Sequence, residues 1–243
     1  MEQGGEDTPG GIEEKELIRK AVYAVSSGEL PSPALPERRR THGGLRRLRR
    51  ADLPVNTVEL ARYLIGKVIV HDTANGRLSG RIVETEAYPV GDVAGHAFRG
   101  RTPRNGTLFL ERGHAYVYLI YGVSILLNVS SERAGVGAGV LLRAIEPRDG
   151  IELMEGTRRR KQWADIGRGP GRLTKAMKVD LSHDGLDMCR PSSSLWLAET
   201  ARKTGPIGKT VRIGLTHGAS RLLRFYERGN KYISGPKKLS NAF

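Results

Sequence analysis

The sequence has 243 residues, which suits one domain, or a domain with a tail, and allows a hydrophobic core. Its single cysteine, Cys189, excludes an internal disulfide and a multi-cysteine zinc site. No run of about 18 apolar residues and no signal-peptide pattern is found, so an intracellular protein is expected. The formal net charge of +14 favours a polyanionic partner such as nucleic acid.

The first fifty residues differ in composition from the remainder. Residues 38–50 contain seven arginines and no acidic residue. We therefore expect residues 1–50 to form a flexible or loosely ordered basic arm. Ten Lys or Arg and eight Asp or Glu give this segment a net charge of +2, so +12 of the +14 lies in residues 51–243. The main basic surface is thus expected on the folded domain that follows the arm.

Three segments have the features of helices. Thr57 is a suitable N-cap for residues 58–64, whose apolar side chains have helical spacing, and Gly66 would end that helix. Residues 147–158 and 170–177 each begin with a proline, which suits the first position of a helix.

Strand-like runs make up most of the remaining pattern. The dipeptides Asn75-Gly76 and Tyr121-Gly122 lie between such runs and predict hairpin turns. Gly80 is expected to interrupt the strand predicted at residues 78–88. The strands are predicted at residues 67–71, 78–88, 115–120, 124–130, 140–145, 211–215 and 222–228. The fold class that follows is α+β: a single domain with a mainly antiparallel, curved β-sheet flanked by helices.

The segment from Arg81 to Tyr88 carries two carboxylates beside an aromatic ring. Alternate residues of a strand share a face, so Glu84, Glu86 and Tyr88 project together. A carboxylate there could orient and deprotonate a water while the ring stacks on a base. The alternative is a solvated strand with its charges outward, and periodicity does not choose between the two glutamates.

Three tyrosines fall within six positions. Tyr116 and Tyr118 share a strand face, and Tyr121 comes at the turn with Gly122, where its ring could protrude. Such rings serve as stacking platforms or wedges for nucleic acid, although tyrosine is also common in strand cores. His96 lies in a loop before this run, and a lone histidine there could be structural or catalytic.

Two basic segments could contact phosphates. Arg101, Thr102 and Arg104 form a compact loop of donors, and Arg172 and Lys175 lie at the start of a predicted helix. A solvated loop and an ordinary helix cap are the alternatives. The six histidines do not form a ligand pair, so no metal is expected.

Taken in order, these segments resemble one family, the alkyladenine (3-methylpurine) DNA glycosylases. The resemblance extends from about Leu60 to about Ser234 and does not include the N-terminal arm. The motifs that carry it are residues 60–66, 80–88, 102–105, 116–122, 128–130, 141–147 and 223–226.

The resemblance implies a catalytic pair. Glu86 matches the residue that activates water, and Arg143 matches a residue that helps to hold that water. The implied activity is that of a monofunctional DNA-3-methyladenine glycosylase, a hydrolase acting on N-glycosyl bonds in base excision repair. Residues 51–243 would then be the catalytic domain.

The resemblance also implies a base pocket. Tyr88, His96 and Tyr118 match the aromatic side chains that sandwich a flipped base. Asn128 matches the residue that crowds the 2-amino group of guanine, and Tyr121 matches the residue that fills the gap left in the duplex. The substrates would be 3-methyladenine, 7-methylguanine, hypoxanthine and ethenoadenine.

The expected partner is double-stranded DNA with damaged purines. The protein is expected to act as a monomer, to need no cofactor and to have no membrane partner. The location would be the cytoplasm or nucleoid of a bacterium, or the nucleus of a eukaryote. Two alternatives use the same residues. One is a non-enzymatic nucleic-acid-binding module, and the other is a metal-dependent nuclease with Glu84 and Glu86 as ligands.

Overall fold

The computed structural model describes residues 41–42, 44–155 and 165–240. Its described strands form one sheet in the order β1-β2-β8-β3-β4-β7-β6-β5, with β10 paired to β4 and to β9. All the pairings are antiparallel. The strands are β1 (Thr41–His42), β2 (Leu45–Arg47), β3 (Val68–Thr73), β4 (Gly76–Tyr88), β5 (Ala115–Ile120), β6 (Ser124–Ser130), β7 (Gly139–Asp149), β8 (Leu195–Thr200), β9 (Ile207–Thr210) and β10 (Arg224–Glu227).

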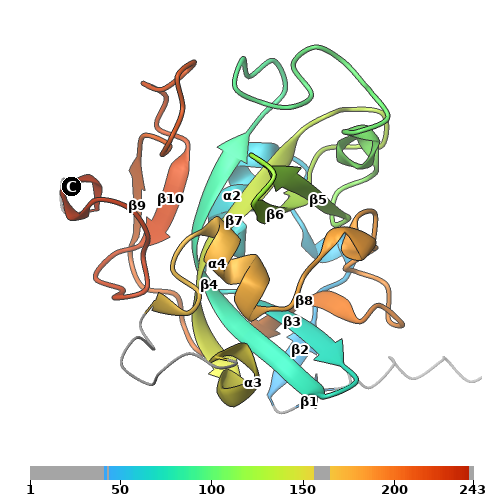
Figure 1. Cartoon of the computed structure of the whole chain (residues 1–243), viewed down its shortest axis with the longest axis vertical. Helices are drawn as coiled ribbons and strands as arrows, with labels where there is room; N and C mark the ends of the chain where they lie inside the picture. The colour runs from blue at the N-terminus through green and yellow to red at the C-terminus, as the bar shows by residue number, and fades with distance from the viewer. Residues whose placement is uncertain (1–40, 43, 156–164, 241–243) are drawn as a thin grey trace, which may run out of the picture. The chain divides into compact units, whose positions relative to one another are not determined.

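The long strand β4 connects the parts of this sheet (Figure 1). One edge of β4 pairs with β7 along most of its length. The other edge pairs first with β3 and then, from Glu84 to Glu86, with β10. The sheet therefore divides near the middle of β4, where register shifts interrupt the pairing with β7 and favour local bending. The predicted α+β class with a mainly antiparallel sheet is confirmed.

Helices pack against the central strands. The described helices are α2 (Thr57–Leu64), α3 (Ile151–Glu155) and α4 (Pro170–Ala176), with short 3-10 turns η1 (Arg50–Asp52), η2 (Gly106–Phe109), η4 (Leu181–His183) and η5 (Lys237–Leu239). Helix α2 contacts β4 and β7, whereas α4 contacts β6 and β7. The Thr85 hydroxyl donates to the Ala61 carbonyl of α2 at 2.9 Å. Because side chains alternate along a strand, Glu84 and Glu86 project from the opposite face of β4.

Several predicted elements match and others differ. The helix expected from Pro147 starts at Ile151 instead, because β7 continues to Asp149 and pairs with β4 as far as Ser79. Gly80 does not break β4, since its missing side chain makes room for Ile145: an added Cβ would lie 2.5 Å from the Ile145 Cδ1. The N-cap of α2 is Asn56, one residue before the predicted Thr57.

Of the two C-terminal strands, β9 is displaced from its expected position and β10 is not. β9 spans Ile207–Thr210, whereas the strand was expected at residues 211–215. β10 spans Arg224–Glu227, within the expected residues 222–228. The sequence pattern did not predict β8 at Leu195–Thr200.

The arginine-rich segment before residue 51 is partly built into the sheet, so strand structure begins before the expected arm boundary at residue 50. β2 pairs antiparallel with β8, and Leu45 and Leu48 are buried. Arg46 binds Asp52 and Glu199. Leu45 and Leu48 are separated by two arginines, so the segment buries its leucines while Arg46 stays within reach of the two acidic side chains. Residues 1–40 of the expected arm and residues 156–158 of the expected helix lie outside the described residues.

None of the described helices is long and apolar enough to cross a membrane.

Candidate active site

A cavity of about 450 Å³ opens on the face of β4 that carries Glu86. This volume falls in the range of roughly 300–1,000 Å³ that is usual for small-molecule sites. β4, β5, β6 and β7 contribute to its wall, together with the loop after β4, the start of α4 and residues 213–215. The structure brings all seven predicted catalytic, pocket and hairpin residues to this cavity: Glu86, Tyr88, His96, Tyr118, Tyr121, Asn128 and Arg143.

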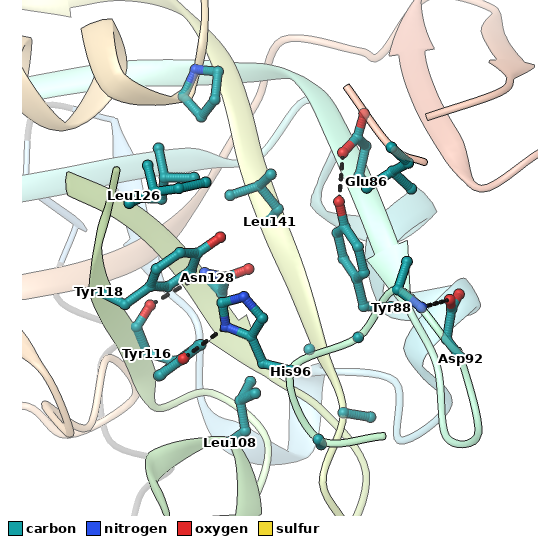
Figure 2. Close-up of a pocket in the computed structure, with 18 of the residues that line it drawn as sticks. Glu86, Tyr88, Asp92, His96, Leu108, Tyr116, Tyr118, Leu126, Asn128 and Leu141 are labelled. Atoms are coloured by element: carbon teal, nitrogen blue, oxygen red, sulfur yellow. Dashed lines mark hydrogen bonds between the residues drawn. The ribbon is translucent and has the colours of Figure 1, made fainter. Parts of the chain in front are cut away.

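The carboxylate of Glu86 is buried at the cavity wall and is surrounded by donors. Its Oε1 accepts from the Ile213 backbone N–H at 2.8 Å and lies 3.0 Å from the Arg143 Nη1. Its Oε2 accepts from the Tyr88 hydroxyl at 2.9 Å (Figure 2). Burial and the Glu86 charge raise the pKa of Tyr88, so its hydroxyl stays protonated and can donate. These contacts fix the carboxylate in one orientation.

The neighbouring Glu84 has a different environment. It is fully buried, is absent from the cavity lining, and accepts from Arg143 Nε at 2.9 Å and Arg224 Nε at 2.6 Å. The Ser234 N–H donates to its second oxygen at 2.6 Å. Burial lowers the pKa of Arg143, but attraction by Glu86 and Glu84 outweighs burial, so the net pKa is raised. Arg143 is therefore a cation that links the two carboxylates.

An aromatic wall lies across the cavity from Tyr88 (Figure 2). The Tyr116 and Tyr118 rings are stacked with centroids 5.2 Å apart, and the His96 ring meets Tyr118 edge-on at 4.5 Å. Burial of the His96 ring against the wall lowers its pKa, and the positive charge of Arg104 lowers that pKa further. Burial followed by the negative charge of nearby Glu86 raises the pKa of Tyr118 to about 12. The wall is therefore uncharged near neutral pH.

Sequence reasoning left two contributors out of the site. Tyr116 lines the cavity, and its hydroxyl lies 2.8 Å from the Nδ1 of His96. Its place on the same strand face as Tyr118 was the available signal. Ile213 contributes a backbone N–H to Glu86, which no side-chain pattern can reveal.

Asn128 and Tyr121 lie on the hairpin formed by β5 and β6. Asn128 is buried and donates from Nδ2 to the Tyr116 carbonyl at 3.3 Å. Tyr121 is at the tip, with φ 50° in the left-handed region, followed by Gly122 at φ 68°. Its side chain protrudes from the turn, since the residue is 88% exposed. One hairpin therefore carries a buried amide and a projecting ring.

The five predicted phosphate-contact residues are exposed and lie outside the cavity lining: Arg101, Thr102, Arg104, Arg172 and Lys175. The Asn105 side chain organises the first loop by accepting from the Thr102 N–H at 2.6 Å and donating to the His96 carbonyl at 2.8 Å. Arg104 donates to the Leu119 carbonyl at 3.1 Å. This loop therefore connects exposed cations directly to the cavity.

Within the described ranges, no group of three or more His, Cys, Asp or Glu side chains could hold a metal ion. The two glutamates proposed as nuclease ligands share the Arg143 guanidinium instead. A divalent cation between them would meet that positive charge. This donor arrangement disfavours the nuclease alternative.

Comparison with known proteins identifies the family. The family model described as Methylpurine-DNA glycosylase (MPG) matches residues 51–231. The chain belongs to the methylpurine-DNA glycosylase family. The resemblance inferred from the sequence motifs is thereby confirmed.

Curated relatives agree with this methylpurine-DNA glycosylase assignment. A protein from Mesorhizobium japonicum is 61% identical over 190 residues, which are 78% of this chain and 91% of the relative. One from Paraburkholderia phytofirmans is 55% identical over 192 residues, covering 79% of this chain and 90% of the relative. A relative from Methanoculleus marisnigri is 38% identical over 181 residues, covering 74% and 94%. Each bears the name "Putative 3-methyladenine DNA glycosylase".

Proposed function

We propose that the protein is a monofunctional DNA glycosylase of base excision repair. It would take alkylated or deaminated purines out of the duplex, hydrolyse the N-glycosidic bond and leave an abasic site. The observation that carries this proposal is the Glu86 carboxylate, held by Arg143, Tyr88 and a backbone N–H at the wall of an aromatic cavity. Family membership and the names of the relatives support the same activity.

Base binding follows from the shape and chemistry of the cavity. A purine inside a duplex is out of reach, so it must be extruded at a cost of a few kcal/mol; DNA glycosylases are a standard example of this principle. Tyr88 on one side and Tyr118 with His96 on the other offer faces between which a flat base can stack. The exposed Tyr121 ring would fill the space vacated in the duplex.

Hydrolysis requires a nucleophile at C1′ of the sugar. Glu86 would accept a proton from a water as the water oxygen bonds to C1′ and the bond to the purine nitrogen breaks with its electron pair. The negative charge of Glu86 would also stabilise positive charge on the sugar as that bond lengthens. Arg143, 3.0 Å from Glu86, would help to hold the water. An alkylated purine is a cation before cleavage and leaves as a neutral base.

Selection among purines would come from pocket fit. Asn128 is buried on β6, where its amide would crowd the 2-amino group of an undamaged guanine. The substrates we propose are 3-methyladenine, 7-methylguanine, hypoxanthine and ethenoadenine. Affinity for any duplex would come from phosphate contacts of the exposed residues Arg101, Thr102, Arg104, Arg172 and Lys175.

The direct test is excision in the presence of a chelator. Duplexes carrying each of the four lesions are incubated with the protein with and without the chelator, and samples are analysed before and after alkali. Strand breaks that arise after alkali alone indicate abasic sites and support the proposal. Direct strand cleavage abolished by the chelator would favour a nuclease, and binding with no reaction would favour a binding module.

A further inference from the structure

A buried cation lies against the Tyr88 ring. The guanidinium carbon of Arg212 is 4.5 Å from the ring centroid, and the Arg212 side chain is fully buried. Asp92 holds it through two contacts, Nη1 to Oδ2 at 2.8 Å and Nη2 to Oδ1 at 3.0 Å. Nη1 also donates to the Ala87 carbonyl at 2.9 Å. These contacts fix the guanidinium over the ring.

The Asp92 carboxylate also binds a second arginine, Arg221, which does not lie over the Tyr88 ring. Arg221 Nη1 lies 3.0 Å from the Asp92 Oδ2, but the Arg221 side chain is 47% exposed. Of the described cations, Arg212 is the one positioned over the Tyr88 ring. Arg221 therefore provides a matched control: it shares the counterion without the ring contact.

The position of Arg212 affects what can stack on the other side of the ring. An aromatic face attracts a cation through its negative π-electron density. Arg212 draws that density toward itself, so less is available on the cavity side of Tyr88. Two carboxylates lie near the ring and both are paired: Glu86 with Arg143, and Asp92, which lines the cavity, with Arg212 and Arg221. His96 on the opposite wall is kept uncharged near neutral pH, because burial lowers its pKa.

We propose that Arg212 determines the charge class of the bases that the cavity prefers, favouring uncharged purines over cationic alkylated ones. This inference rests on the proposed glycosylase function and deepens it. A cationic 7-methylguanine would gain less from stacking on Tyr88 than it would on a ring with a free far face. An uncharged hypoxanthine would stack on Tyr88 almost equally well with or without Arg212 on the far face of the ring. Arg212 is thus a specificity-determining residue that acts through Tyr88.

The test compares two lesions in the same duplex sequence. Single-turnover excision of 7-methylguanine and of hypoxanthine is measured for the wild type, Arg212→Met and Arg221→Met, and the ratio of the two rates is taken for each protein. Differences in leaving-group reactivity cancel when the ratios are compared. We expect Arg212→Met to raise the ratio about three- to ten-fold in favour of 7-methylguanine, the factor typical of a cation–π contact. Arg221→Met should change it by less than about two-fold.

Folding is checked by thermal melting, because Arg212→Met leaves Asp92 with fewer partners. The double variant Asp92→Asn/Arg212→Met removes both buried charges, so a less well paired Asp92 carboxylate at the cavity wall cannot account for a rise in the ratio; the same rise is expected. An unchanged ratio in the folded variants, with both bases still released, would overturn the inference and leave the proposed function intact. A wild type that releases neither base would instead overturn the proposed function and the inference together.

Discussion

Two buried glutamates two residues apart on β4 have separate surroundings. Glu86 faces the cavity, whereas Glu84 is enclosed by Arg143, Arg224 and Ser234. Strand alternation puts both on one face, so periodicity could not choose between them. The difference arises because β7 and β10 bring the two arginines to Glu84 from distant parts of the sequence. Family resemblance chose Glu86 as the catalytic residue, and that role stays a prediction; of the two glutamates, Glu86 is the one that lines the cavity.

Replacing each glutamate with glutamine should affect mainly the excision rate at Glu86 and mainly the stability of the fold at Glu84. Glu86→Gln keeps the size of the side chain but removes the base, so excision should fall by about 10²–10⁴-fold while binding of lesion DNA persists. Glu84→Gln removes one member of a buried charged network, which typically costs about 3–5 kcal/mol, and should lower the melting temperature with a smaller effect on rate. Single-turnover rates on a hypoxanthine duplex, with binding and melting measured in parallel, distinguish them. An inactive Glu84→Gln beside an active Glu86→Gln would reverse the assignment.

At the level of elements, the β5–β6 hairpin joins the base pocket to the proposed wedge. Its turn holds Tyr121 and Gly122 at positive φ, a conformation that glycine adopts readily and tyrosine does not. The projecting Tyr121 ring makes little contribution to the core, since the residue is 88% exposed. An exposed aromatic residue in an uncommon backbone conformation is typical of a functional position.

Tyr121→Ser should therefore impair function more than folding. The melting temperature should change by no more than about 2 °C, because exposed substitutions usually cost under about 0.5 kcal/mol. Affinity for a hypoxanthine duplex should fall at least about ten-fold, because the variant cannot fill the gap left by the flipped base. Melting curves and equilibrium titrations provide the two values. A large loss of stability that accounts for the loss of binding would make Tyr121 a structural residue.

Local sequence patterns predicted some elements better than others. The β5–β6 hairpin was predicted well, because its tyrosines, turn dipeptide and alternation all lie within a short segment. The pairing of β2 with β8 joins residues about 150 positions apart, and no local signal reveals it. The same holds for Ile213, whose backbone reaches Glu86 from beyond β9. Long-range pairing therefore accounts for most of the fold and site that sequence reasoning missed.

A buried ion pair links β4 to the end of β10, and it should make the free energy of unfolding depend on pH in the acidic range. Arg81 and Glu227 form this pair, and the Gly205 N–H donates to Glu227 at 2.8 Å. Burial raises the pKa of Glu227, but the hydrogen bonds from Arg81, Gly205 and Asn230 outweigh it and lower the pKa to about 2. Because the folded pKa is below the ordinary value of 4.5, the stabilisation is present above about pH 4.5 and is lost as the pH falls toward 2.

Denaturant unfolding of the wild type and Glu227→Gln tests this dependence. At pH 7 the variant should be less stable by about 3–5 kcal/mol, the usual cost of breaking a buried pair. The difference between the two proteins should shrink as the pH is lowered from 4.5 to 3, because over this range the carboxylate takes up a proton in the unfolded wild type but stays ionised in the folded protein, whose Glu227 pKa is about 2. A difference that stays constant over this range would contradict the role of the pair.

On the scale of the whole molecule, the described part of the arginine-rich segment contributes both buried and ion-paired side chains to the fold. Leu45 and Leu48 belong to the buried core, and Arg46 is paired with Asp52 and Glu199. Residues 38–50 were expected to serve as a basic arm on the strength of their charge alone. The two buried leucines tie part of this run to β8 and the core, so the charge of Arg46 contributes to ion pairs in the fold as well as to the basic surface.

Two truncations locate the boundary of the folded domain. Removal of residues 1–40 leaves β2 and Leu48 in place, so the melting temperature and single-turnover excision should stay close to those of the full chain. Removal of residues 1–50 also deletes Leu45 and Leu48 and uncovers β8. Loss of one buried leucine side chain costs roughly 2–5 kcal/mol, and each kcal/mol corresponds to about 2–4 °C at this size. The melting temperature of the shorter protein should therefore fall by about 10 °C or more, whereas equal melting temperatures for the two truncations would return residues 41–50 to the arm.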